Sequence, residues 1–181
     1  MSTSRPRIVV TGAASGIGRA VAEKLAQGAR LILTDINVEG LHAVAKQIEK
    51  QGGSVLHLPC DFAKEAQIRE LVDTITSQEK LDGLVHAAGV GPSQATCEKI
   101  LTINLLGTAI LLEAMTGVTN PNAALVLISS QASYFAAEWL SSAALEILKN
   151  PLRDDFGERI NKACEGHDLS LGTEAYGLAK M

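Results

Sequence analysis

The stretch Thr11-Gly12-Ala13-Ala14-Ser15-Gly16-Ile17-Gly18 decides how the first half of this chain folds. It follows the apolar run Ile8-Val9-Val10, which is typical of a buried strand, and it leads into an amphipathic helical pattern over residues 17–27. A strand, a glycine-rich turn and the start of a helix together predict a dinucleotide-binding element. A helix-entry loop without a ligand is the alternative, and the motif alone does not separate the two.

Each glycine has its own use in such an element. Gly12 lets the chain turn tightly, Gly16 lacks the Cβ that would block a pyrophosphate, and Gly18 lets the helix pack closely on the strand. The free N–H groups and the positive dipole end of the helix would then face the phosphates. Ser15 and Ile17 lie between the glycines and complete the cofactor-binding candidates of this loop.

The composition places the chain among ordinary globular proteins. A chain of 181 residues, 46% of them hydrophobic and 20% charged, is long enough for one domain with a sizeable core. The net charge of -4 argues against nucleic acid or an anionic membrane as a partner. We find no signal-peptide pattern and no apolar run near the ~20 residues that a membrane helix needs. The three cysteines are scattered and the histidines lack ligand spacing, so we expect no metal site and a cytoplasmic protein.

Strand-like and helical patterns alternate along the chain. Strands are predicted at about 7–10, 30–34, 54–59, 81–86 and 124–129, and helices at about 17–27, 38–51, 64–77 and 96–116. This alternation is typical of the α/β class, with a parallel sheet covered by helices on both faces. Right-handed crossovers predict the strand order 3-2-1-4-5. We therefore expect a doubly wound parallel sheet of the Rossmann type, in a single domain over residues 1–181.

Two acidic residues follow predicted strands. Asp35 ends the second strand about 20 residues after the glycine turn, where a carboxylate accepts hydrogen bonds from the adenosine ribose. The same carboxylate would repel the 2′-phosphate of NADP, and Arg19 is expected on the helix surface, so NAD is favoured. A solvated turn carboxylate is the alternative for Asp35. Asp61 ends the third strand, where it either meets an adenine amino group or begins the next helix.

The fourth strand ends in His86-Ala87-Ala88-Gly89. The small residues Ala88 and Gly89 would let the backbone pass close to a cofactor. We interpret His86 as a structural strand-end histidine rather than a base. Further on, Asn104 stands inside an apolar helical stretch, although asparagine competes with helix hydrogen bonds. It either holds a water at a distorted turn or is an ordinary buried polar residue.

The last candidates lie towards the end of the chain. The fifth strand ends in Ser129-Ser130, and Tyr176 and Lys180 stand four residues apart, on one face of a helix. An ammonium group beside a tyrosine favours the ionised phenol, so the tyrosine can exchange a proton with a carbonyl oxygen or an alcohol. A tyrosine and a lysine at this spacing are common by chance and mean little alone.

Together these residues resemble the short-chain dehydrogenase/reductase family. The resemblance rests on the glycine turn, the two strand-end aspartates, Ala87-Ala88-Gly89, Asn104, Ser130 and Tyr176-x-x-x-Lys180. It implies that Tyr176 is the catalytic acid/base and that Lys180 promotes its ionisation and holds the nicotinamide ribose. It also implies that Ser130 orients the substrate oxygen and that Asn104 supports a water linked to Lys180.

Two local features look like the bacterial 3α-hydroxysteroid dehydrogenase/carbonyl reductase branch of that family. The segment between Gly89 and Asn104 is short, and the one between Ser130 and Tyr176 is long. This resemblance implies a ketone or secondary alcohol as substrate, with a hydroxysteroid as one candidate. We expect the insertion 131–175 to be helical and to wall the substrate site, with packing or dimerisation as its alternative role.

The chain also departs from the family. His86 stands where asparagine is usual, and the sequence ends at Met181, before the later strands and the substrate-covering segment of family members. The fifth strand is apolar and has no predicted partner at its outer edge, so we expect the functional polypeptide to be longer.

The sequence therefore predicts an NAD-dependent oxidoreductase that moves hydride between the cofactor and a carbinol or carbonyl carbon. Its partner is a small-molecule ketone or alcohol, and we expect a homo-oligomer, in the first instance a dimer. A non-catalytic or truncated nucleotide-binding module with a regulatory or structural role is the alternative.

Overall fold

The computed structural model describes residues 5–77, 79–164 and 172–181, and the chain divides into two compact units. Unit 1 comprises Met1–Ala88 and Leu111–Ile128, and unit 2 comprises Gly89–Ile110 and Ser129–Met181. Each unit is described by itself. The single domain over residues 1–181 stays a prediction.

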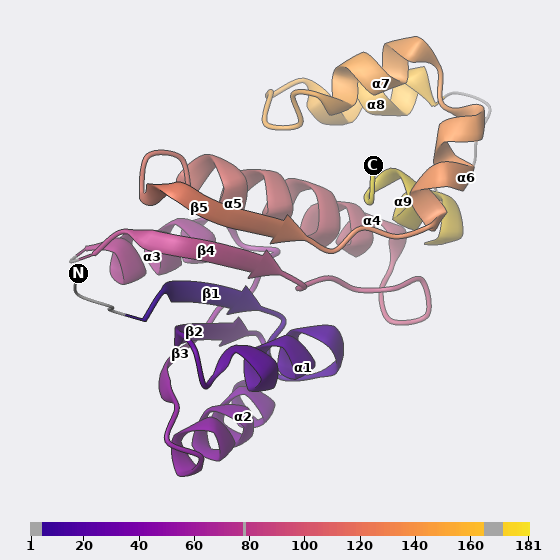
Figure 1. Cartoon of the computed structure of the whole chain (residues 1–181). Helices are drawn as coiled ribbons and strands as arrows, with labels where there is room; N and C mark the ends of the chain where they lie inside the picture. The colour runs from indigo at the N-terminus through magenta and orange to yellow at the C-terminus, as the bar shows by residue number, and fades with distance from the viewer. Residues whose placement is uncertain (1–4, 78, 165–171) are drawn as a thin grey trace. The chain divides into compact units, whose positions relative to one another are not determined.

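Unit 1 contains a five-stranded parallel sheet (Figure 1). Its strands are β1 (Arg7–Thr11), β2 (Arg30–Asp35), β3 (Ser54–Pro59), β4 (Leu81–His86) and β5 (Thr119–Leu127). They lie in the order β3-β2-β1-β4-β5, which confirms the predicted doubly wound topology. Parallel strands of this order bring their carboxyl ends, and the loops that follow them, to one edge of the sheet.

Helices cover both faces of the sheet. Val9 and Val10 are consecutive residues of β1 and point to opposite faces, and both are almost fully buried. The covering helices α1 (Gly16–Leu25), α2 (Val38–Lys50) and α3 (Glu65–Thr76) bury apolar residues at helical spacing. Between the sheet and α1 and α2 lies one core cluster, which includes Val10, Ala22, Leu33, Leu41, Val44 and Ile48.

The start of β5 differs from the prediction of 124–129. The strand covers Thr119–Leu127, and its register with β4 shifts near its beginning. There the Asn120 side chain donates a hydrogen bond to Asp82 Oδ1 over 2.8 Å. Because this contact holds Asn120 beside β4, the strand begins before its apolar run.

Unit 2 is helical. It contains α4 (Cys97–Ile100), the π-helix η1 (Leu101–Gly107), the start of α5 (Thr108–Ala114), α6 (Ala132–Trp139), α7 (Ser142–Leu148), α8 (Phe156–Ala163) and α9 (Gly172–Leu178). The predicted helix over 96–116 is therefore present, but its middle is π-helical rather than continuous α-helix. Helices α6 to α9 share a core that includes Ala136, Ala144, Phe156, Ile160 and Leu178.

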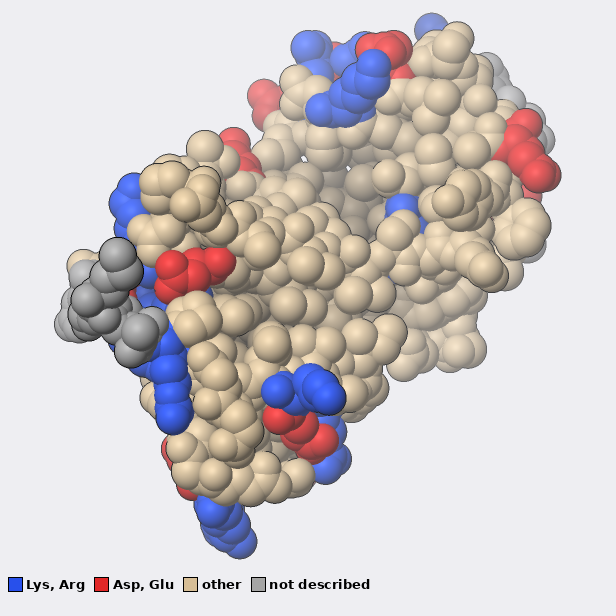
Figure 2. Space-filling model, viewed as in Figure 1, with Lys and Arg blue, Asp and Glu red and all other residues tan. Residues whose placement is uncertain are grey.

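Charged side chains of both signs lie on the surface (Figure 2). Figure 2 shows basic and acidic side chains near one another on the visible face. Ion pairs of the described residues include Arg30–Glu79 and Arg153–Asp155. Among the described residues, no helix is both long and apolar enough to cross a membrane.

Candidate active site

The glycine turn between β1 and α1 is built as the sequence predicts. Gly12 has a φ of 66°, and a Cβ there would lie 2.8 Å from the Ala88 nitrogen. A Cβ on Gly18 would overlap the Gly12 carbonyl, so only glycine lets α1 pack this closely. Gly16 has a φ of 52° and open space around its Cα, which leaves room for a ligand next to the helix start.

The first turn of α1 also keeps its N–H groups available. Ser15 is the residue before the helix, and its side chain makes no capping hydrogen bond. Ser15, Gly16 and Ile17 are all exposed. Uncapped N–H groups beside a glycine without a Cβ form a cradle that fits a pyrophosphate.

Asp35 ends β2 and is fixed by backbone hydrogen bonds. Its Oδ2 accepts from the Ala14 N–H of the glycine turn, and its Oδ1 accepts from the Asn37 N–H, both over 2.9 Å. Arg19 points elsewhere, because its Nε donates to Glu23 over 2.8 Å on the surface of α1. The Asp35 carboxylate therefore faces no arginine in these contacts.

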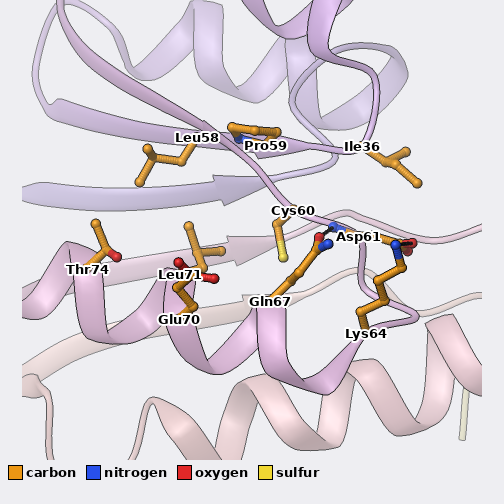
Figure 3. Close-up of a pocket in the computed structure, with 10 residues that line it drawn as sticks. All are labelled: Ile36, Leu58, Pro59, Cys60, Asp61, Lys64, Gln67, Glu70, Leu71 and Thr74. Carbon is orange, nitrogen blue, oxygen red and sulfur yellow. Dashed lines mark hydrogen bonds and ion pairs between the residues drawn. The ribbon is translucent and has the colours of Figure 1, made fainter.

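Asp61 lies at one end of a pocket of about 470 Å³ in unit 1 (Figure 3). Its Oδ1 accepts from the Ala63 N–H over 2.9 Å, and Lys64 Nζ lies 3.7 Å from its Oδ2. Because α3 begins only at Glu65, Asp61 closes the turn before the helix and also lines the pocket. The lining consists of Ile36, Leu58, Pro59, Cys60, Asp61, Lys64, Gln67, Glu70, Leu71 and Thr74. Burial, with a smaller effect of the Asp61 charge, raises the pKa of the Cys60 thiol to about 11.

His86 is held as a structural residue at the end of β4. The Thr11 hydroxyl accepts hydrogen bonds from the Ala87 and Ala88 N–H groups over 3.1 and 3.0 Å. Both lone pairs of the hydroxyl oxygen are then used, so its proton is left for His86 Nδ1, which lies 2.8 Å away. This assigns the buried imidazole as the Nε2–H tautomer. Thr11 was not among the predicted site residues, although its place at the strand end was visible in the sequence.

In unit 2 the π-helix places Asn104 against the segment after β4. Asn104 is 4% exposed, its Oδ1 accepts from the Val90 N–H and its Nδ2 donates to the Val90 carbonyl, both over 2.9 Å. A Cβ built on Gly89 would lie 3.1 Å from Asn104 Oδ1 and 3.4 Å from Lys180 Nζ. Asn104 and Lys180 therefore meet at Gly89, where a side chain would crowd them.

Ser129 and Tyr176 lie close to Lys180 in the same unit, and Ser130 follows Ser129 in the chain. The Ser129 hydroxyl donates to the Lys180 carbonyl over 2.9 Å, and Ser130 Oγ accepts from the Ala132 N–H over 3.2 Å. Lys180 Nζ lies 5.8 Å from the centre of the Tyr176 ring. Burial lowers the pKa of Lys180. The sequence predicts no role for Ser129, and its hydrogen bond to Lys180 shows that it helps to hold the turn after α9 in place.

A second pocket, of about 490 Å³, lies between α6 and α9 of unit 2. It is lined by Pro92, Ala132, Phe135, Ala136, Glu138, Trp139, Thr173, Glu174, Tyr176 and Gly177. The insertion thus contributes Phe135 and Trp139 to a pocket that Tyr176 also lines, whereas Phe156 packs in the core.

The structure distributes the predicted residues over the two units. Unit 1 carries Gly12, Ser15, Gly16, Ile17, Gly18, Asp35, Asp61 and Ala88, and unit 2 carries Gly89, Asn104, Ser130, Tyr176 and Lys180. In the described parts of the chain, no group of three or more His, Cys, Asp or Glu side chains could hold a metal ion.

Comparison with known proteins gives a family match. A family model described as short chain dehydrogenase matches residues 6–144. The chain is 36% identical over 116 residues to D-threitol dehydrogenase of Mycolicibacterium smegmatis, which covers 59% of this chain and 45% of that protein. It is 35% identical over 184 residues to bovine (Bos taurus) 15-hydroxyprostaglandin dehydrogenase (NAD+), which covers 87% of this chain and 66% of that protein. The chain thus spans less than two thirds of both relatives.

A solved structure with a bound cofactor is also similar. It is a short-chain dehydrogenase/reductase from Burkholderia phymatum in complex with NAD, with a TM-score of 0.65 and 26% identity. The match covers 74% of this chain and 52% of that one. The relatives are dehydrogenases and reductases of diverse named substrates, and they do not single out the hydroxysteroid branch.

Proposed function

Because the chain belongs to the short-chain dehydrogenase family, we propose that it interconverts a secondary alcohol and a ketone with NAD as cofactor. The observation that carries the proposal is the set of polar side chains in unit 2. Asn104, Ser130, Tyr176 and Lys180 all belong to that unit, and Asn104 and Lys180 converge at Gly89.

The nicotinamide supplies or accepts the hydride when NAD is bound. The chain supplies proton transfer and orientation. In the reduction, the Tyr176 hydroxyl donates its proton to the carbonyl oxygen, and in the oxidation it takes the proton of the alcohol. Ser130 orients the substrate oxygen. The Lys180 ammonium favours the ionised tyrosine and holds the nicotinamide ribose, and Asn104 supports a water linked to it.

The residues of unit 1 fit the other half of NAD. The uncapped start of α1 beside Gly16 suits the pyrophosphate, and Asp35 suits the ribose hydroxyls. The Asp61 pocket suits the adenine. NAD rather than NADP is proposed because a fixed Asp35 carboxylate would repel a 2′-phosphate, while Arg19 is engaged with Glu23.

The proposed substrates are small-molecule secondary alcohols and ketones, and a hydroxysteroid belongs in the panel to be tested. The pocket lined by Tyr176 supports this class, because aromatic and small side chains form most of its wall.

Replacement of Tyr176 tests the proposal directly. We expect Tyr176→Phe to reduce NADH formation from secondary alcohols by roughly 10²–10⁴-fold, because it removes the proton acceptor. NAD binding, followed by fluorescence titration, should change little. The matched control is Tyr134→Phe, since Tyr134 is the chain's other tyrosine and is 75% exposed.

Two results would count against the proposal. Full activity of Tyr176→Phe would assign the acid/base role to another residue. NAD binding by the unmodified chain without turnover of any alcohol or ketone in the panel would favour the alternative, a nucleotide-binding module without catalysis.

A further inference from the structure

The pocket of unit 2 has an unusual combination of side chains for a site that binds neutral alcohols. Three aromatic residues line it: Phe135 and Trp139 from α6 and Tyr176 from α9. Two carboxylates, Glu138 and Glu174, line it as well, and its described lining includes no lysine or arginine. The wall is therefore aromatic and negatively charged.

Packing between α6 and α9 fixes this wall. A Cβ on Gly177 would lie 2.8 Å from the Ala132 carbonyl oxygen and 3.2 Å from the Ala136 Cβ, so the two helices cross in close contact there. Successive residues of a helix are turned by about 100°, which places Glu174 and Tyr176 on opposite sides of the face that Gly177 presents. Both residues line the pocket, one on each side of this helix contact.

Neither carboxylate is neutralised by the chain as described. No ion pair or hydrogen bond joins the side chain of Glu138 or Glu174 to another described residue, and Glu174 Oε2 is enclosed without a hydrogen-bond partner. An enclosed carboxylate oxygen without a donor is unfavourable, and a positive charge held in the adjacent pocket would stabilise it. The Glu174 charge also acts inside the unit, because it adds to burial in raising the pKa of the Cys164 thiol.

Carboxylates and aromatic rings attract the same kind of group. The face of an aromatic ring attracts an ammonium ion, and a carboxylate pairs with it directly. We propose that the substrate of this site carries a protonated amine beside its carbinol or carbonyl group, held by Glu138, Glu174 and the aromatic wall. This inference rests on the proposed function, because it names the substrate class of the Tyr176 site.

Ligand binding tests the charge preference without turnover. Trp139 is the chain's single tryptophan and lines the pocket, so its fluorescence reports on occupancy. Benzylammonium and its uncharged isostere ethylbenzene are the probes. We expect benzylammonium to bind about tenfold more tightly at low salt, and added salt to reduce the difference.

Glutamine substitutions test whether the two pocket carboxylates cause the preference for benzylammonium. Glu174→Gln and Glu138→Gln should each weaken benzylammonium binding roughly three- to tenfold, because each removes a charge and keeps the side-chain shape. Glu158→Gln is the control, since Glu158 is exposed on α8 and does not line the pocket. Equal binding of the two probes, or unchanged benzylammonium binding by both pocket variants, would overturn the inference.

Turnover measurements distinguish a failure of this inference from a failure of the proposed function. With NADH, we expect a higher kcat/KM for 4-(aminomethyl)acetophenone than for 4-ethylacetophenone, and Glu174→Gln should lower the ratio of the two. Equal or better turnover of the uncharged ketone would overturn the inference while the proposed function stands. Charge-selective binding that both glutamine variants weaken, without turnover of either ketone, would support the ammonium site and count against the proposed function.

Discussion

At the scale of single residues, Asp35 is the side chain on which the proposed choice of NAD depends most directly. Its two oxygens accept N–H groups of Ala14 and Asn37, so the carboxylate is held at the end of β2 next to the glycine turn. A fixed negative charge discriminates against a phosphate more strongly than a mobile one, because it cannot turn away.

We therefore expect the chain to bind NADH more tightly than NADPH. Asp35→Ala should reduce the difference between the two affinities, because it removes the repulsion between the carboxylate and the 2′-phosphate. Asp35→Asn removes the charge and keeps the side-chain shape. It therefore distinguishes the effect of the charge from the effect of the hydrogen bond to the glycine turn. Fluorescence titration with both cofactors measures the effect. NADPH binding to the unmodified chain as tight as NADH binding would refute this prediction.

At the scale of secondary-structure elements, Asp82 joins three neighbouring strands. It stands in β4, its Oδ2 accepts from the Arg7 N–H of β1 over 2.8 Å, and its Oδ1 accepts from Asn120 of β5. These hydrogen bonds, that from the Arg7 backbone first, lower the pKa of Asp82 below its ordinary value of 3.8. The carboxylate therefore fastens the amino ends of β1 and β5 to β4.

This lowered pKa predicts a pH-dependent contribution to stability. Because the folded-state pKa lies below the unfolded value, the contribution is present at neutral pH and is lost as the pH falls through the folded pKa. We expect Asp82→Asn to lower the free energy of unfolding at neutral pH and to have a smaller effect in acid. Urea unfolding at several pH values measures it, with the exposed Asp73→Asn on α3 as control. An effect of Asp82→Asn that is independent of pH would contradict the prediction.

At the scale of the whole molecule, the sheet of unit 1 ends in an apolar edge strand. The last three residues of β5, Leu125, Val126 and Leu127, are 40%, 48% and 42% exposed. In the described part of the chain no strand pairs with the outer edge of β5. Such an edge favours pairing between copies, because its backbone groups and apolar side chains are both available.

A charge on this strand should reduce self-association. We expect Val126→Lys to lower light scattering of concentrated protein while the far-ultraviolet circular dichroism stays unchanged. Val38→Lys is the control, because Val38 is 56% exposed on α2 and adds the same charge away from the edge. Equal effects of the two substitutions would assign the change to net charge rather than to the strand edge.

The sequence by itself determined the sheet and the glycine turn after β1. The strands β3 and β4 have the predicted bounds, and the strand order follows from alternating patterns and right-handed crossovers. Gly12 and Gly18 could be interpreted from the sequence because Gly12 adopts the positive φ of a tight turn and Gly18 packs on Gly12, a few residues away. These features depend on local periodicity and sterics, which a single sequence contains.

Only the tertiary structure decided where β5 begins, where Asn104 lies and which aromatic residues of the insertion line a pocket. The early start of β5 depends on Asn120 meeting Asp82, and the place of Asn104 depends on a π-helix that brings it to Val90. Likewise, Phe135 lines a pocket while Phe156 is buried in the core of the same insertion. Partners distant in sequence are chosen by packing between elements, and no short-range pattern records that choice.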